Sequence, residues 1–310
     1  VMWDGTAWTT VTSVTSTDGG TEALSMIEVA GVVYAAIEGV GVLRYDTATS
    51  SALSTWSSAN TLHSDSITHM AVSGNQLLLG SSDNGLARFD YAAGFWLSTW
   101  TSANWLSSDT VTGVERVGPT LYILAGEDLH SYNTTNGVFS TTYALATLGL
   151  ANLGASLTVW PASGGASPAY DALLVDDGSG NLIHLSPNQS PFIEGELLLA
   201  SAPATDEMTG LVEVDNVLYI GSADDSMLLM RYDVSDSVWL TPWTVTDNVL
   251  GVVAAPTSQG TSTLLLTYEE SPVVEEMDTS GNSLQTYDGT NGCYPSTANI
   301  LSTATNVDHL

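Results

Sequence analysis

The chain of 310 residues contains no lysine, and its only basic residues are four arginines, against 34 acidic residues. The formal net charge at pH 7 is therefore −30. This charge disfavours nucleic acid as a partner, because the phosphate backbone requires a basic protein surface. An anionic membrane surface would also repel the chain. So many acids are typical of a strongly hydrated, self-repelling surface.

Cysteine and long apolar runs are also scarce. The single cysteine, Cys293, cannot form a disulfide within the chain, and it is expected to be a small loop residue or a link between chains. The longest apolar runs, such as 77–79 and 264–266, are too short to span a bilayer, so no membrane insertion is expected. No stretch has the spacing of a capped amphipathic helix. The chain opens without Met or a signal-peptide pattern, which is typical of a mature or excised part of a longer protein.

In place of these features the sequence has a repeat of 44 residues. The tripeptide RYD at 44–46 recurs as RFD at 88–90, and STW at 54–56 recurs at 98–100. Asn84-Gly85 lies between two apolar runs, which is a strong signal for a hairpin turn. A period in the forties, made of short strand-like pieces, is typical of one four-stranded sheet per repeat in a radial array.

The repeats therefore predict an all-β protein, a single β-propeller domain over 1–310. Seven blades are expected, of which the last is incomplete or split. The six complete four-stranded blades are expected at 23–56, 66–100, 110–143, 155–200, 208–243 and 248–288. Residues 1–11 resemble the end of a blade and 305–310 resemble the beginning of one, so the two pieces are expected to belong to the split blade.

Arginine and tryptophan recur together in three of the repeats. Each arginine precedes its tryptophan by 12 residues, in the pairs Arg44 and Trp56, Arg88 and Trp100, and Arg231 and Trp243. Because the pairs recur, a structural role is predicted, with the tryptophans packed against the neighbouring sheet. The arginines are expected to bridge an Asp or a backbone carbonyl between adjacent blades. Aromatics four residues apart, such as Trp96 and Trp100, are expected on one face of a strand. A stacking platform for sugars is the functional alternative.

Candidate sites outside these repeat positions are few. The Asp-rich turn at Asp176 and Asp177 is a weak candidate for calcium, which prefers clustered carboxylates, although Asp, Asn and Gly are also the residues that β-turns require. Asn133 and Asn188 fit the N-glycosylation sequon. No catalytic residue and no cofactor is predicted, because the sequence has no nucleophile elbow, phosphate loop or dinucleotide fingerprint.

Residues 62–90 resemble a repeat of the two-component-regulator propeller type. The matching elements are a leucine at 62, Ile-Thr at 67–68, an apolar strand ending in Gly-Ser at 80–81, Asn-Gly-Leu at 84–86 and Phe-Asp at 89–90. The Trp that the family usually has in the second strand is missing. The resemblance implies a β-propeller, often extracellular, that serves as a sensing or interaction module. It brings no catalytic residues, since propellers host many functions.

Three functions follow from these observations. The first is a non-catalytic extracellular or cell-surface propeller for structure or protein–protein assembly, with copies of itself or neighbouring domains as partners. An incomplete last blade would expose unpaired strand edges, which invite strand addition and head-to-tail filaments. The second is a ligand-binding or sensory module, with a glycan or peptide at the central channel. Ser25, Thr68, Thr112 and Thr209 would then face the ligand. The third is a propeller enzyme such as a lyase or hydrolase.

Overall fold

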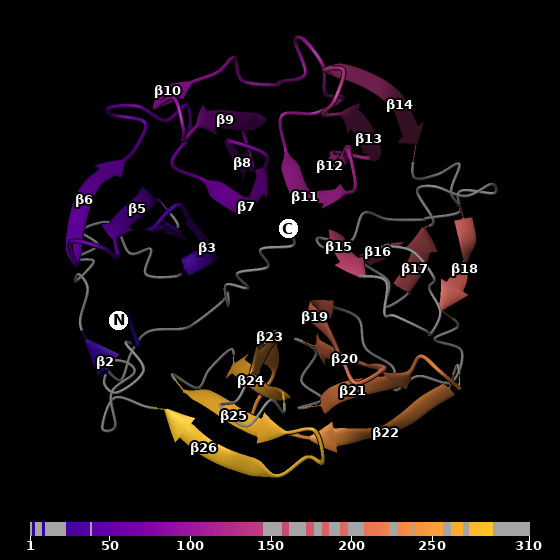
Figure 1. Cartoon of the computed structure of the whole chain (residues 1–310). Coiled ribbons are helices and arrows are strands. Elements are labelled where there is room, and N and C mark those ends of the chain that lie inside the picture. The colour runs from indigo at the N-terminus through magenta and orange to yellow at the C-terminus, as the bar shows by residue number, and fades with distance from the viewer. Residues whose placement is uncertain are drawn as a thin grey trace.

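The computed structural model describes residues 2–3, 8–9, 23–37, 39–144, 157–160, 172–176, 182–185, 193–197, 208–222, 228–236, 238–256, 262–268 and 273–287. Within these ranges all the regular structure is β-strand. The sheets stand around a common centre like the blades of a propeller, with one strand of each nearest the centre (Figure 1). The predicted all-β propeller class is confirmed.

Each sheet consists of consecutive antiparallel strands, named here from the innermost outwards. Sheet I is β3 (Ala23–Val29), β4 (Val32–Ile37), β5 (Gly41–Asp46) and β6 (Ser51–Trp56). Sheet II is β7 (Ile67–Ser73), β8 (Gln76–Ser81), β9 (Leu86–Asp90) and β10 (Phe95–Trp96). Sheet III is β11 (Val111–Val117), β12 (Thr120–Ala125), β13 (Asp128–Asn133) and β14 (Val138–Ala144).

The second half of the chain repeats this plan. Sheet IV is β15 (Leu157–Trp160), β16 (Ala172–Asp176), β17 (Leu182–Leu185) and β18 (Ile193–Leu197). Sheet V is β19 (Met208–Val214), β20 (Val217–Ser222), β21 (Leu228–Asp233) and β22 (Val238–Thr244). Sheet VI is β23 (Val249–Pro256), β24 (Ser262–Tyr268), β25 (Val274–Asp278) and β26 (Ser283–Tyr287). A two-stranded pair of β1 (Met2–Trp3) and β2 (Trp8–Thr9) stands apart.

The expected blade count needs correction. Six complete blades and a split seventh were predicted, but in the described ranges only five sheets have four strands of four residues or more. In sheet II the outer strand β10 is two residues long, and Trp100 meets Leu86 only in an isolated bridge. Among the described residues beyond Trp96, only Leu97, whose N donates to Arg88 O (2.9 Å), and Trp100 keep backbone bonds to β9, so the strand expected to reach residue 100 is not continuous. A seventh blade is not formed by the described residues, where β1 and β2 pair only with each other, and 305–310 lies outside them.

Turn chemistry explains how successive strands reverse. The turns after β3 and β19 place Ala30 and Gly31, and Asp215 and Asn216, at positive φ, the conformation that two-residue hairpins require. After the third strand of most sheets, an Asp or Asn side chain accepts hydrogen bonds from the next backbone N–H groups. Asp46 Oδ1, for example, accepts from Thr49 N (3.0 Å) and Ala48 N (2.9 Å), and these bonds lower the pKa of this exposed carboxyl.

Two glycines separated by 44 residues have a common reason. A Cβ on Gly41 would lie 2.2 Å from the carbonyl oxygen of Trp56, and a Cβ on Gly85 would lie 2.1 Å from that of Trp100. Both also have positive φ, at 100° and 75°. Only glycine therefore allows the tryptophan carbonyl to approach the backbone at the beginning of the third strand.

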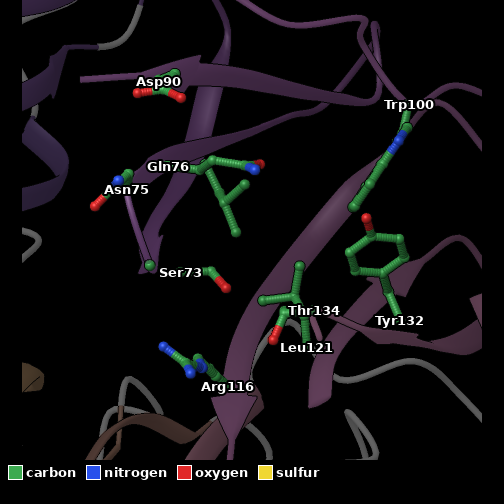
Figure 2. A pocket seen from close by; sticks show the side chains of 11 residues that line it. Ser73, Asn75, Gln76, Asp90, Trp100, Arg116, Leu121, Tyr132 and Thr134 are labelled. Atoms are coloured by element: carbon green, nitrogen blue, oxygen red, sulfur yellow. The ribbon is translucent and has the colours of Figure 1, made fainter. Parts of the chain in front are cut away.

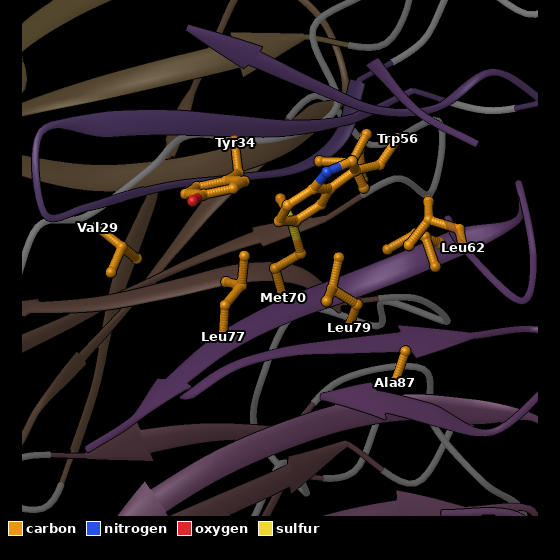
Figure 3. Packing of buried hydrophobic residues seen from close by; sticks show 11 residues of the cluster. Val29, Tyr34, Trp56, Leu62, Met70, Leu77, Leu79 and Ala87 are labelled. Atoms are coloured by element: carbon orange, nitrogen blue, oxygen red, sulfur yellow. The ribbon is translucent and has the colours of Figure 1, made fainter. Parts of the chain in front are cut away.

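Apolar residues fill the spaces between neighbouring sheets and hold the ring together. Between sheets I and II, Tyr34 and Trp56 face Met70, Leu77 and Leu79 (Figure 3). The second strands β8, β12 and β20 share the burial pattern of one partly buried residue followed by five buried ones. A strand that is covered on both faces needs apolar residues at successive positions, which explains the short apolar runs of the sequence.

Candidate functional site

The three repeated arginines lie over the rings of their tryptophans. The guanidinium carbon is 4.3 Å from the ring centroid of Trp56 for Arg44, 4.1 Å from that of Trp100 for Arg88, and 4.1 Å from that of Trp243 for Arg231. This stacking is a cation–π contact. Partial burial lowers the pKa of Arg44 and Arg88 from the high value of a free guanidinium.

Each stacked arginine also binds a backbone carbonyl, but within its own sheet. Arg44 Nε donates to Ser54 O (2.9 Å), Arg88 Nε to Ser98 O (3.0 Å), and Arg231 Nη1 to Thr241 O (3.3 Å). In all three cases the acceptor lies ten residues after the arginine. The expected backbone-carbonyl contact is present, whereas the expected bridge between adjacent blades is wrong. The acceptor lies in the segment beside the arginine's own strand, within β6 for Ser54, within β22 for Thr241 and just after β10 for Ser98.

A β-bulge explains this acceptor and overturns a second expectation. In sheet V, Leu229 pairs with Trp243 but Arg231 pairs with Leu240, so the outer strand contains one extra residue between them. The pairing of β5 with β6 shifts in the same way. An extra residue reverses the alternation of side chains. Aromatics four residues apart therefore lie on opposite faces, and the prediction of a common face is wrong.

The tryptophans then connect neighbouring sheets, as expected from their recurrence. The ring centroid of Trp56 in sheet I lies 4.6 Å from that of Phe89 and 4.9 Å from that of Trp96 in sheet II, and both pairs pack edge to face. Trp100 of sheet II lies 4.5 Å from Tyr132 and 4.9 Å from Phe139 of sheet III. Trp96 and Trp100 thus pack against different neighbours. Edge-to-face geometry at these distances is the favourable arrangement for aromatic pairs.

A cavity of about 340 Å³ lies between sheets II and III, beside the turn that joins β7 to β8 (Figure 2). Sheet II lines it with Ser73, Gly74, Asn75, Gln76, Leu78, Asp90 and Trp100, and sheet III with Arg116, Leu121, Tyr132 and Thr134. Leu78, Trp100 and Leu121 are buried, whereas the remaining side chains are mostly polar. We call this cavity the II/III pocket.

The II/III pocket exists because five repeat positions differ from those of the preceding interface. Between sheets I and II these positions hold Val29, Val32, Tyr34, Val72 and Tyr91, which all belong to the apolar cluster there. Between sheets II and III they hold Ser73, Gln76, Leu78, Arg116 and Thr134. The replacements remove two aromatic rings and introduce polar groups. Space therefore remains between the sheets, and it has polar walls.

The interface between sheets V and VI resembles the I/II interface and not the II/III interface. Its equivalent positions hold Val214, Val217, Tyr219 and Ala254, all within one apolar cluster. Two interfaces thus use a Val-Val-Tyr filling, and the II/III interface departs from it. The sequence signal that could have identified the pocket is a column of the repeat in which valine and tyrosine give way to serine, glutamine and leucine.

The predicted central site receives no support from the hydroxyl groups assigned to it. Ser25 Oγ accepts a hydrogen bond from Met70 N (3.1 Å), and Thr68 Oγ1 donates to Val111 O (2.8 Å). These bonds connect the inner strands of neighbouring sheets, so the two groups are occupied in holding the ring together. Thr112 Oγ1 is buried without a hydrogen-bond partner among the described residues, and the side chain of Thr209 lies outside them.

The calcium and glycosylation candidates stay predictions. Asp176 is the last residue of β16, and Asp177 and Asn188 lie outside the described residues. Within the described ranges, no group of three His, Cys, Asp or Glu residues could hold a metal. Asn133 Oδ1 accepts from Thr135 N (2.9 Å) and Asn136 N (3.2 Å), which is the turn role of Asp46. An Asn at this position therefore has a structural explanation as well as the sequon.

One serine–histidine contact also needs a chemical interpretation. Ser107 Oγ lies 3.0 Å from His130 Nε2, but that nitrogen is also the acceptor of Ser107 N (3.2 Å), and the hydroxyl bonds Ala125 O (2.9 Å). His130 is buried, and desolvation lowers its pKa. The imidazole therefore fixes the loop before β11 to sheet III. The hydroxyl is engaged with a carbonyl rather than directed at a substrate.

No protein-family model and no curated protein matches the chain. Among solved structures it is similar to the extracellular domain of a protein described as a hybrid two-component system from B. thetaiotaomicron, with 14% identity and a TM-score of 0.65. A second extracellular domain, from a one-component system of the same organism, has 15% sequence identity to this chain and a TM-score of 0.65. The computationally designed Ika8 protein has 11% sequence identity and a TM-score of 0.51. At these identities the similarity shows the propeller fold alone.

The coverage of these structures differs. The match includes 92% of this chain but 37% of the first structure, and 91% of this chain but 35% of the one-component system. The designed protein is matched over 88% of both chains. The chain therefore spans little more than a third of the length of the two bacterial extracellular domains. Among the described residues there is no helix with the length and hydropathy needed to cross a bilayer.

Proposed function

We propose that this chain is a non-catalytic ligand-binding module of an extracellular sensor, and that its ligand binds in the II/III pocket. The single observation that carries the proposal is that a polar pocket at the II/III interface stands where the I/II and V/VI interfaces have an apolar filling. The structural neighbours, which are extracellular domains of bacterial regulators, support the extracellular location and the sensory role. A glycan or a peptide fits the polar lining.

The composition of the pocket supports binding rather than catalysis. Its lining includes one carboxylate, that of Asp90, and neither His nor Cys. Oδ1 of Asp90 already accepts a hydrogen bond from Ala93 N (2.8 Å). The pocket therefore offers hydrogen-bond donors and acceptors and an aromatic wall, which are the features of a binding site for a small polar ligand.

The proposal is tested by filling the pocket with the residues of the I/II interface. A triple variant, Ser73→Val, Gln76→Val and Leu78→Tyr, restores the Val-Val-Tyr pattern and should fold with unchanged stability or better. Saturation-transfer NMR against a library of saccharides and short peptides should give hits with the wild-type chain that disappear with the triple variant. Binding that is equal in both proteins would place the ligand elsewhere and end the proposal.

Self-association is a separate proposal that the pocket does not address. The assembly and filament hypotheses, with copies of this chain or neighbouring domains as partners, depend on 1–11 and 305–310, of which only β1 and β2 are described. Sedimentation velocity over a range of concentrations would test them, and a single monomeric species at every concentration would contradict assembly.

A further inference from the structure

Arg116 differs from the three other arginines in its strand, its repeat position and its exposure. It lies on the inner strand β11, outside the repeated position, and it is exposed, with no tryptophan beneath it. Val72 occupies the equivalent position in sheet II and packs in the I/II apolar cluster. A guanidinium therefore stands where the I/II interface has a valine that contributes to packing, and it lines the II/III pocket.

The side chain of Arg116 is held in place while its charge stays available. Its Nε donates to Gly118 O at 2.8 Å, which fixes the plane of the guanidinium. Among the described residues its terminal nitrogens have no carboxylate or other partner, although the chain contains 34 acidic residues. In Figure 2 the guanidinium extends from its strand towards the part of the pocket lined by Ser73. A positioned guanidinium with two free terminal nitrogens fits a planar, bidentate anion.

We infer that the II/III pocket binds a ligand that carries a carboxylate, and that Arg116 pairs with this carboxylate. The inference rests on the proposed function, because it assigns the ligand's chemistry to the same pocket. Gln76 offers hydrogen bonds to the rest of the ligand, Thr134 Oγ1 can accept one because its own proton is donated to Pro119 O (2.8 Å), and Trp100 and Tyr132 offer an aromatic wall. A sugar acid and the free carboxyl end of a peptide both present this chemistry.

The test uses pairs of probes that differ only in the carboxylate. One pair is galacturonic acid and galactose, and the other is an N-acetylated dipeptide with a free carboxyl end and its C-terminal amide. Isothermal titration calorimetry should show the acid of one pair binding at least tenfold more tightly than its neutral counterpart. The pair that responds identifies the source of the carboxylate.

Variants at position 116 then assign the preference to the arginine. Arg116→Gln should weaken binding of the acid by about 10- to 100-fold, the range for a lost hydrogen bond to a charged group, and leave the neutral probe unaffected. Arg116→Lys should recover part of the loss, because it keeps the charge but loses the bidentate geometry. Ala52→Asp, on the exposed outer strand β6, makes the net charge more negative by the same amount and should change nothing.

The outcomes separate this inference from the proposed function. If neutral probes bind as tightly as acids and the pocket-filling triple variant abolishes both, the pocket is a binding site and the carboxylate inference is wrong. If the acids bind and Arg116→Gln has no effect, the inference is also wrong. If no probe of either pair binds at millimolar concentration, or the triple variant binds all of them unchanged, both the inference and the proposed function fail.

Discussion

The I/II and II/III interfaces have the same architecture but different fillings. Both join a tryptophan that pairs with the third strand of its own sheet to the aromatic residues of the next sheet, Trp56 to Phe89 in one case and Trp100 to Tyr132 in the other. At the first interface, valine and tyrosine side chains fill the remaining space. At the second, the same positions are smaller or polar. We call these tryptophan contacts, together with the side chains that fill the space around them, the seam between two sheets. The seam stabilises the ring, and a single interface with a different filling can be used for binding without changing the ring.

The largest effect is expected from removing the seam itself. Trp56→Ala should destabilise the fold by about 3–5 kcal/mol, because Trp56 is 5% exposed and contacts Tyr34, Phe89 and Trp96. Urea denaturation followed by circular dichroism measures the loss. The matched control is Phe95→Ala, where the ring is 52% exposed and the cost should be below about 0.5 kcal/mol. Equal losses in the two variants would refute the stabilising seam.

A reciprocal exchange tests whether filling distinguishes the two interfaces. Tyr34→Leu gives the I/II interface the residue of the pocket and should cost about 1–3 kcal/mol, because it leaves a cavity beside Trp56. Leu78→Tyr gives the II/III interface the residue of the filled seam and should change stability by less than about 1 kcal/mol, because the space already exists. Differential scanning calorimetry of the Tyr34→Leu and Leu78→Tyr variants measures the change in stability that each causes. If both exchanges cost the same, the two interfaces do not differ in packing.

The sequence predicts the ring well and the pocket poorly, for physical reasons. The period of 44 residues and the recurrence of Trp56 and Trp100 indicate radial sheets joined by aromatic seams, because a recurring large residue serves the same contact in each repeat. The bulge before each tryptophan was not predictable, since a one-residue shift in hydrogen-bond register does not alter composition or spacing. The pocket depends on Gln76 and Arg116 standing 44 residues after Val32 and Val72, and the sequence alone does not tell which repeat positions face a neighbouring sheet and must fill the space there.

Adjacent residues on β11 extend the comparison to the other face of sheet III. Arg116 belongs to the pocket side, whereas Glu115 points to the opposite face, since neighbours on a strand alternate. Desolvation raises the pKa of Glu115 from 4.5 to about 8. Because the folded chain holds this proton more tightly than the unfolded chain does, the associated stability is complete below pH about 4.5 and is lost as the pH rises through about 8.

We expect this loss to be about 1–2 kcal/mol between pH 5 and pH 8, because solvent reaches part of the side chain and reduces the full effect. Glu115→Gln should remove the loss, so that its denaturation midpoint depends less on pH than that of the wild type. Glu28→Gln removes a carboxylate from an exposed position of β3 and is the control for net charge. If Glu115→Gln and Glu28→Gln have the same pH profile, Glu115 is not protonated in the folded chain.

The smallest expected effect compares the two kinds of arginine. Arg44→Met keeps an unbranched side chain over Trp56 but loses the cation–π contact and the hydrogen bond to Ser54 O, at a cost of about 1–2 kcal/mol. Arg116→Met loses only the bond to Gly118 O at an exposed site, and should cost less than about 0.5 kcal/mol. Thermal melts of the two variants, which have the same net charge, measure the difference. An arginine whose loss destabilises the fold belongs to the structure of the ring. If Arg116→Met were as destabilising as Arg44→Met, Arg116 would be a structural residue too, and its exposed charge would need no ligand to explain it.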